Sequence, residues 1–531
     1  MAVKDSIFAN PKIFPASPSA TQPSTPASQF QTVSTPERFS TTVDVLLVNP
    51  PLPDKDFWQP GLAHYIRQEN MVWPQVSLAQ LAAMLTLDYQ VEIVDAAAQR
   101  LNWSDFEAIL REKQPRYYLT QLRPATFQND LLGVVLAREL GAKTIAFGPQ
   151  ITERARDIIE FYPHLDFILR DEPELTLREL IDTLETIAGR WAEPQTESRA
   201  WLRLVKAFKD ADPEWQPAWV GSADPETKIG QIQGLTWHSN GKVIENKSRP
   251  YIANLDDLPL PHHHLLPLNR YRTPLHNQPF AFVSTSRGYA ETMVTDNQAI
   301  RFPIRTRTPT SILTELWLLY DLGLQQVHIR VEGFSANREQ IINLCQMMIA
   351  EEFPLPWTCT CCVDQVDAEI LACMARAGCH LIIWDIEALS TQMSEAIEPT
   401  YRIKQVPQVL TWAKQAGIKN CGYFTIGVPG QTEKDIQETI DFAKELPLDL
   451  ALFHPAISYS HEVTFNIAFN NRQPTQESLA TSLPPERLEY WQKRAFREWA
   501  FRSGSIWTRI KGLKAWARFR NVATGGLQST G

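Results

Sequence analysis

Two carboxylates with the spacing i, i+2, Asp385 and Glu387, are the residue pair in this chain best suited to acid–base chemistry. They follow the apolar run 381–384, which predicts a buried strand, so both side chains point to the same face of that strand. Carboxylates paired in this way can transfer protons or bind a cation. The alternative is that they only provide hydrogen bonds to a ligand.

The run Cys359-Thr360-Cys361-Cys362 contains three of the seven cysteines. In a strand, Cys359 and Cys361 would face one side and Cys362 the other, so three thiols cannot easily converge on one metal. Free cysteine often packs as a small hydrophobic residue. The pattern favours core packing, with a metal or redox role as the alternative.

Three adjacent histidines, His262 to His264, follow Pro261. Adjacent side chains cannot all turn toward one zinc ion, and no fourth ligand is evident nearby. We therefore predict a surface turn here, with zinc binding as the alternative.

A basic group flanks the segment 289–300. Its arginines could bind a carboxylate or phosphate ligand. Alternatively, they are solvated or pair with nearby acids such as Glu291 and Asp296, which the pattern slightly favours. The group consists of Arg287, Arg301, Arg305 and Arg307.

The composition indicates a globular protein of two or three domains, with 531 residues, 44% hydrophobic and 21% charged. A net charge of −9 argues against nucleic-acid binding by the whole chain. The chain shows no membrane-spanning run, no signal peptide and no disulfide framework, which predicts a cytoplasmic protein. Residues 1–42, rich in Pro, Ser and Thr, are predicted to be disordered, and the patch 7–14 is either a docking motif or plain tail.

Residues 43–187 alternate short apolar strands with helices, the pattern of a doubly wound parallel sheet of the Rossmann type. Ligands of such sheets bind beyond the carboxyl ends of the strands. This places Asn49–Pro51, Gln121–Thr126 and Gly148–Thr152 around a crevice. The predicted strands cover residues 45–48, 91–95, 144–147 and 167–170.

The remaining chain divides into three parts. Residues 188–265 are predicted to be a linker or insertion, irregular up to about residue 230. Residues 266–470 predict six parallel strands with intervening helices, which form a partial (β/α)₆ barrel of the TIM type or an open sheet. Residues 471–531 predict a basic, Trp-rich helical tail. The six strands cover residues 282–285, 327–331, 357–363, 381–387, 422–427 and 450–454.

Several ordered segments resemble B12-binding-domain radical S-adenosylmethionine (SAM) proteins, the group that includes the anaerobic magnesium-protoporphyrin monomethyl ester cyclase. The resemblance covers roughly residues 43–470 and implies a cobalamin-binding-like sheet followed by the barrel. No single segment is specific, but their order is. They are 148–152, 166–174, 254–261, 377–379, 385–387, 416–418 and 427–432.

The resemblance also implies roles for individual residues. Glu387 corresponds to an acidic SAM contact at the end of the fourth barrel strand. Gly427 and Gly430 correspond to a glycine turn that approaches the adenosine. Glu332 stands where the family often has an acidic pair, whereas Asn49 and Gly148 lie at the cofactor edge of the first sheet. The family's Asp-x-His-x-x-Gly loop is missing from residues 43–187, but members can bind cobalamin without it.

The sequence departs from the family in one loop. Thr285-Ser286-Arg287-Gly288 resembles the start of the family's Cys-x-x-x-Cys-x-x-Cys loop, which holds a [4Fe–4S] cluster. Tyr289, Met293 and Asp296 stand at the three cysteine positions. Iron–sulfur clusters require soft thiolate ligands, so the cluster is predicted to be absent even though the family implies SAM, [4Fe–4S] and cobalamin.

The predicted function is therefore that of a degenerate radical SAM protein with a binding, assembly or regulatory role, related to tetrapyrroles. The alternatives are an active SAM- and cobalamin-dependent radical enzyme with unusual cluster ligands, and non-radical methyl transfer. Whether the chain is an enzyme stays open, with the balance against it. Between Glu486 and Arg520, ten Lys/Arg face three Asp/Glu, which suits a protein partner or an anionic membrane surface.

Overall fold

The computed structural model describes most of the chain from residue 43 to residue 502. The described residues are 43–52, 73–123, 126–190, 199–220, 224–272, 278–288, 293–295, 298–300, 303–330, 338–386, 399–428, 431–455 and 483–502. Two sheets organise them, one of seven strands and one of six.

The seven-stranded sheet has the order β2-β1-β3-β4-β5-β6-β7. Strands β1 to β5 are parallel, whereas β6 and β7 are antiparallel additions. Its strands are β1 Val45–Asn49, β2 Val91–Asp95, β3 Tyr117–Gln121, β4 Lys143–Phe147, β5 Phe167–Leu169, β6 Leu235–Ser239 and β7 Lys242–Glu245. The strand that follows β1 in the chain, β2, lies on one side of it, and β3 and the later strands lie on the other. The carboxyl ends of β1 and β3 are therefore the switch point at which doubly wound sheets bind ligands.

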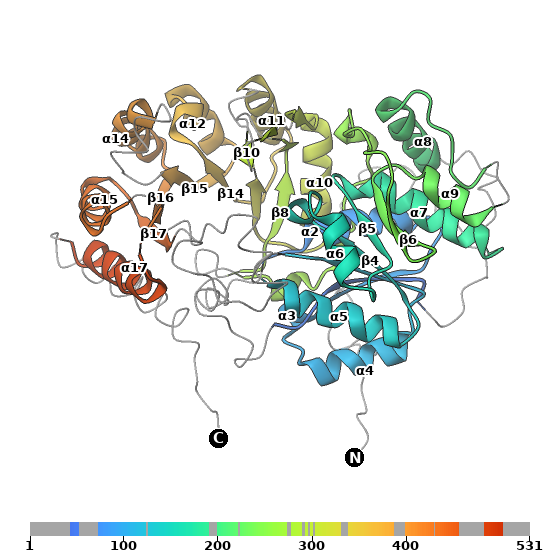
Figure 1. Ribbon diagram of the computed structural model, residues 1–531. Coiled ribbons are helices and arrows are strands. Elements are labelled where there is room, and N and C mark those ends of the chain that lie inside the picture. Colours follow the sequence, from blue (N-terminus) through green and yellow to red (C-terminus); the bar gives the residue numbers. More distant parts are fainter. Residues whose placement is uncertain are drawn as a thin grey trace, which may run out of the picture. The chain divides into compact units, whose positions relative to one another are not determined.

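Helices cover both faces of this sheet, which agrees with the burial of its central strands on both sides (Figure 1). One core contains residues such as Val45 and Leu47 with α2 and α7, and the other contains Leu46 and Val48 with α4, α5 and α6. The doubly wound prediction is confirmed. The helices are α2 Val76–Leu85, α3 Ala96–Gln99, α4 Trp103–Lys113, α5 Phe127–Glu139, α6 Ala155–Phe161, α7 Pro173–Ile187, α8 Arg199–Ala211 and α9 Pro225–Gln231.

The segment predicted to be an irregular connector is largely ordered. It forms α8 and α9, and the hairpin β6–β7 extends the first sheet by pairing with β5. Phe208 of α8 stacks on Trp215 at 4.2 Å, and Trp215 and Trp219 are buried core residues. Its polar composition concealed the helices because only one face of each is buried.

The six-stranded sheet is parallel and follows chain order, β17-β16-β15-β14-β13-β8. All six predicted strands are present with shifts of a few residues: β8 Ala281–Ser284, β13 Val327–Arg330, β14 Trp357–Cys361, β15 Cys379–Ile386, β16 Lys419–Ile426 and β17 Leu450–Pro455. Such sequential parallel order is that of a partial TIM-type barrel. The predicted fold class is confirmed.

Helices lie along one side of this second sheet (Figure 1). Their starts are set by local capping: Thr308 and Asp367 accept hydrogen bonds from backbone N–H groups of α10 and α12, and Thr432 forms a capping box with Asp435 in α15. The helices are α10 Pro309–Asp321, α11 Arg338–Ala350, α12 Ala368–Arg376, α14 Pro399–Gln415, α15 Glu433–Glu445 and α17 Pro485–Ala500.

Two short hairpins follow β8. Strands β9 (Ser286–Arg287) and β12 (Arg305–Thr306) pair antiparallel, and β10 (Met293–Thr295) pairs with β11 (Gln298–Ile300) between them. Gly288 is required at the turn after β9, because φ is +99° and a Cβ would overlap the Pro303 carbonyl.

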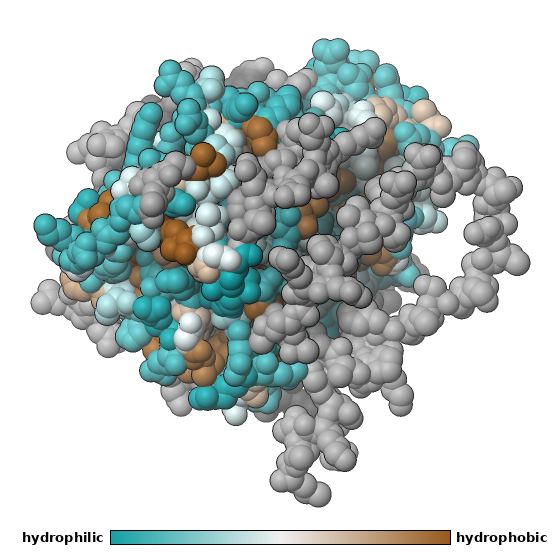
Figure 2. All heavy atoms as spheres, turned by 90° about the vertical axis from the view of Figure 1, so that its right-hand side faces the viewer, coloured by the Kyte–Doolittle hydropathy of each residue, from teal (hydrophilic) through white to brown (hydrophobic). Residues whose placement is uncertain are grey.

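Among the described helices, none is both long and apolar enough to cross a bilayer. The exposed hydrophobic side chains on the face shown in Figure 2 are scattered among polar residues, without one continuous apolar patch.

Candidate functional site

The first candidate site is the carboxyl edge of the first sheet, and one part of it is filled by the protein itself. Asn49 Nδ2 at the end of β1 donates to Asp95 Oδ1 at 2.7 Å, and the Tyr271 hydroxyl donates to Asp95 Oδ2 at 2.8 Å. Burial raises the pKa of Asp95, against the pull of these hydrogen bonds. The predicted crevice residue Asn49 therefore makes an internal contact, and Tyr271, which follows the linker, lies over the ends of β1 and β2.

The β3–β4 side of this edge is shaped by close backbone approach. A Cβ on Gly148 would lie 2.6 Å from the Leu122 carbonyl oxygen, so any larger residue would push the two loops apart. Buried Asp130 accepts hydrogen bonds from Thr126 Oγ1 at 2.7 Å and from Arg123 Nη2 at 3.0 Å, which fixes the loop after β3. The three predicted segments thus follow neighbouring strands at one edge.

The second candidate site is the face of the six-stranded sheet turned away from its helices, here called the inner face. Parallel register places Phe282, His328 and Thr358 side by side on it. Closer to the carboxyl ends of the strands, the inner face carries accessible polar residues. The residues that alternate with them along each strand point to the helices and belong to the core. The accessible ones are Ser284, Arg330, Thr360, Cys362, Asp385, Tyr423, Thr425 and His454.

Aromatic contacts mark two positions on the inner face. At the β8 edge, Trp73 stacks on Phe282 with ring centroids 5.1 Å apart, and Phe282 meets His328 edge-on at 5.1 Å. At the other end, Tyr423 stacks on His454 at 5.8 Å. Asp385 lies on the inner face with an exposed side chain, and desolvation by the surrounding protein raises its pKa. The acid–base role predicted for Asp385 with Glu387 remains a prediction.

All seven cysteines lie in the described part of the chain, and six are buried. Cys359 and Cys361 point toward α11 and α12, with their sulfur atoms 3.6 Å apart, whereas half-buried Cys362 follows on the opposite face. Burial raises the pKa of Cys359 well above its usual value. Core packing, the favoured interpretation of this run, fits this geometry, and no metal-binding group of three His, Cys, Asp or Glu occurs among the described residues.

The basic group has partners other than the predicted ones. Arg287 pairs with Glu174 at 2.6 Å and with Glu172 at 3.3 Å, and Arg305 Nη1 pairs with Glu172 at 2.8 Å. The acids come from the start of α7, some 115 residues away, which sequence proximity could not indicate. Burial alone would raise the pKa of Glu172, but Arg305 and Arg287 lower it overall. Arg301 lies outside the described residues.

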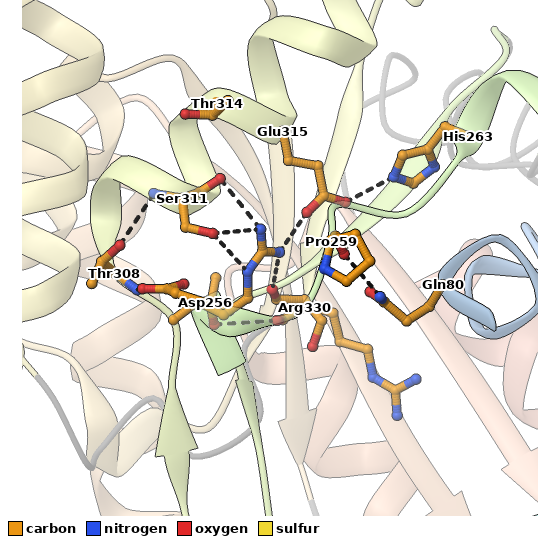
Figure 3. A network of polar contacts seen from close by, with 12 residues as sticks. Gln80, Asp256, Pro259, His263, Thr308, Ser311, Thr314, Glu315 and Arg330 are labelled. Carbon is orange, nitrogen blue, oxygen red and sulfur yellow. Dashed lines mark hydrogen bonds and ion pairs between the residues drawn. The ribbon is translucent and has the colours of Figure 1, made fainter. Parts of the chain in front are cut away.

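The histidine run is not a surface turn. His263 is fully buried, and its Nε2 lies 2.8 Å from Glu315 Oε1, while Glu315 Oε2 pairs with Arg307 (Figure 3). His262 Nδ1 contacts Thr86 Oγ1 at 3.1 Å. Burial, with the neighbouring histidines, lowers the pKa of His262 to about 4. The surface prediction was wrong because α10 buries a matching carboxylate opposite His263.

Gly427 is placed at the end of β16 as predicted, with φ +80°. A Cβ there would overlap Leu488 Cδ2 of α17, so this glycine allows the tail helix to pack on the turn. The proposed contact with adenosine remains a prediction. Several predicted site residues lie outside the described residues: Tyr289, Asp296, Glu332, Glu387 and Gly430. Only the backbone of Met293 is described, in β10.

The first helix of the basic tail is part of the core. Leu488, Trp491, Phe496 and Trp499 of α17 are buried, so its apolar face is not free for a membrane. The remainder of the tail, residues 503–531, lies outside the described part, and its predicted contact with a partner or membrane remains a prediction.

Sequence reasoning missed Trp73, His328 and the Glu172–Glu174 pair as site residues. Trp73 stands alone between Val72 and Pro74, with no pattern around it. The two glutamates flank Pro173 in a segment whose family resemblance was visible, but their partners were not.

The comparisons with known proteins agree with this geometry. Residues 289–443 match the radical SAM superfamily. The chain therefore contains a radical SAM domain, and the resemblance inferred from the sequence is confirmed. The match begins at Tyr289, the first of the three positions at which the resemblance predicts a cluster cysteine.

Two relatives align over most of the chain. One is an uncharacterized methyltransferase of Pyrococcus horikoshii, 26% identical over 391 residues, which are 73% of this chain and 76% of the relative. The other is the anaerobic magnesium-protoporphyrin IX monomethyl ester cyclase of Rubrivivax gelatinosus, 21% identical over 71% of this chain and 63% of the cyclase. The chain thus spans slightly less than two thirds of the cyclase.

Two solved structures share the fold across both sheets. The radical SAM methyltransferase TsrM from Kitasatospora setae, with cobalamin and a [4Fe–4S] cluster bound, matches with a TM-score of 0.55 at 14% identity, over 78% of this chain and 75% of TsrM. The cobalamin-dependent SAM radical enzyme OxsB matches with a TM-score of 0.52 at 14% identity, over 85% of this chain and 61% of OxsB.

Proposed function

We propose that this chain is a ligand-binding member of the radical SAM superfamily that does not cleave SAM reductively, and that it acts in binding, assembly or regulation of a tetrapyrrole-type molecule. Reductive cleavage needs an iron–sulfur cluster to deliver the electron. The proposal rests chiefly on one observation, the shortage of thiolates that could hold that cluster.

The donor set of the altered loop does not fit a [4Fe–4S] cluster. A phenol, a thioether and a carboxylate replace three thiolates at Tyr289, Met293 and Asp296. The chain's own cysteines do not compensate. Only Cys362 is partly accessible, and buried thiols with raised pKa values stay protonated. This supports a protein without the cluster.

The tetrapyrrole part of the proposal is supported by the alignment with the magnesium-protoporphyrin ester cyclase and by the accessible aromatic and polar residues of the inner face. No residue of the first-sheet edge among those described provides a histidine for cobalamin in the Asp-x-His-x-x-Gly setting. Cobalamin binding through the Asn49–Gly148 edge therefore remains a prediction for which the related folds are the support.

Iron and acid-labile sulfide analysis of protein purified without air tests the proposal. After reconstitution with iron and sulfide, we expect the natural chain to hold only trace iron and to lack the broad absorption of a cluster. The matched control carries Tyr289→Cys, Met293→Cys and Asp296→Cys together, and it should take up about four iron atoms per chain. About four iron atoms in the natural chain would overturn the proposal.

SAM-dependent methyl transfer is a second candidate, because a relative aligned over 73% of this chain is named a methyltransferase. Such a reaction could proceed without a cluster on this chain. Isothermal titration tests it, since the absence of binding heat at millimolar SAM would exclude a useful SAM site. An active radical enzyme would require thiolates from a partner chain, and it would release 5′-deoxyadenosine under strong reductant.

A further inference from the structure

We propose that Trp73 and Phe282 form a stacking platform at the β8 edge of the inner face, and that this platform binds a planar porphyrin-type macrocycle. The inference rests on the proposed function and names the ligand class of the same site. It joins a residue that precedes α2 of the first sheet to a strand of the second.

Neighbouring aromatic rings fix the orientation of both rings of the platform. The Trp73 and Phe282 rings are nearly parallel, with an interplanar angle of 20° at 5.1 Å, and Phe280 meets Trp73 edge-on at 6.1 Å. Phe282 is itself supported edge-on by His328, whose Nδ1 lies 2.8 Å from Thr358 Oγ1. The indole is therefore held in a defined orientation by two aromatic neighbours.

The indole is only partly covered. Phe282 stacks on it, yet 44% of Trp73 is exposed. Most tryptophans in the described part of the chain are buried. Among the exposed large hydrophobic residues of that part, Trp73 is the one tryptophan. Leaving so large an apolar ring in water has a free-energy cost. An oriented, half-covered indole is the arrangement that stacks a flat ligand.

The ligand class follows from shape and charge. A porphyrin is flat, conjugated and large enough to extend from the indole along the inner face. A corrin is largely saturated and puckered, so it stacks poorly, and a purine would cover only part of the platform. Farther along the same face, exposed Arg330 brings positive charge suited to the carboxylates of a porphyrin.

Titration of the full chain with protoporphyrin IX, followed by absorbance, tests the inference. Trp73→Ala should weaken porphyrin binding roughly ten- to one-hundred-fold, the range expected for one lost aromatic stack. Trp73→Phe keeps a ring and should stay within about threefold of the natural chain. Tyr320→Ala is the matched control, because Tyr320 is an aromatic residue of similar exposure, 43%, on α10, and it should leave affinity unchanged.

Parallel titrations with SAM and hydroxocobalamin distinguish porphyrin binding from binding of the other two ligands. We expect neither to depend on Trp73. Equal porphyrin affinity of the natural chain and a folded Trp73→Ala variant would overturn the inference while leaving the proposed function intact. A loss confined to SAM would overturn the ligand class. A natural chain that binds none of the three ligands would overturn both the inference and the proposed function.

Discussion

Glu315 keeps a negative charge in the core between the linker and α10. It lies between His263 and Arg307, and Figure 3 shows it facing His263 above the cap formed by Thr308 and Ser311. Burial would raise the pKa of Glu315, but the Arg307 charge and the His263 hydrogen bond outweigh it, so the pKa is lowered. The sequence analysis singled out His263 and Arg307 but not Glu315, because a pairing across 52 residues depends on the fold.

A lowered pKa predicts an acid-dependent loss of stability. The contribution of Glu315 to the free energy of unfolding is fully present above its unfolded pKa of about 4.3. It is lost as the pH falls through the lower pKa of the folded state. Glu315→Gln should cost about 3 kcal/mol at pH 7, because it leaves Arg307 buried without its countercharge. It should also flatten the acid limb of the stability curve.

Urea unfolding at pH 7 and below pH 4 measures both effects of Glu315→Gln. Thr314→Ala, at an exposed neighbouring position of α10, is the control and should stay within about 0.5 kcal/mol of the natural chain at both pH values. Parallel pH curves for Glu315→Gln and the natural chain would show that Glu315 is not the titrating group.

At the scale of elements, the glycine turn after β16 allows helix α17 to pack closely against it. Gly427 has φ +80° and contacts Leu488 of α17, whereas Gly417, with φ +86°, has nothing near its missing side chain. Gly417→Ala should therefore cost only the left-handed backbone strain, about 1 kcal/mol, and Gly427→Ala should cost more through overlap.

Leu488→Ala should remove the difference between the two glycine variants, because it relieves the overlap and leaves the backbone strain. Thermal unfolding of the single and double variants measures this. If Gly427→Ala weakens SAM binding without lowering stability more than Gly417→Ala does, the glycine serves the ligand rather than the helix.

Elements were predictable wherever burial follows a simple period. The six barrel strands were found because apolar runs alternate with helices at regular spacing, and α17 was expected within a helical tail. The hairpin β6–β7 was missed since it lies at a sheet edge, where polar residues such as Lys242 and Glu245 are exposed. The inner face was indicated by Asp385, but Trp73 belongs to it only through tertiary packing.

At the scale of the described molecule, a charge cluster links the two sheets. Glu172 and Glu174 at the start of α7 pair with Arg287 and Arg305, which flank the altered loop on β9 and β12. Ile252 of the linker joins it, donating its N–H to Glu172 and accepting from Arg305. We therefore expect the described sheets to unfold together.

A double-mutant cycle tests this coupling. Glu172→Gln and Arg305→Gln should each destabilise the chain, with an interaction energy of about 1 kcal/mol or more, since both side chains are largely buried. The exposed pair Lys434–Glu438 is the control and should give about 0.3–0.5 kcal/mol. Additive effects for Glu172 and Arg305, or two separate unfolding transitions, would contradict a single cooperative unit.

The position of Tyr271 has a consequence for biosynthesis. The phenol that closes the β1–β2 edge is encoded well after the strands it covers, and the arginines that bind α7 come later still. During translation, the strand ends and buried carboxylates of the first sheet therefore stay exposed to solvent until much of the second sheet has been synthesised. Nascent chains stalled before residue 271 should therefore be preferred clients of chaperones.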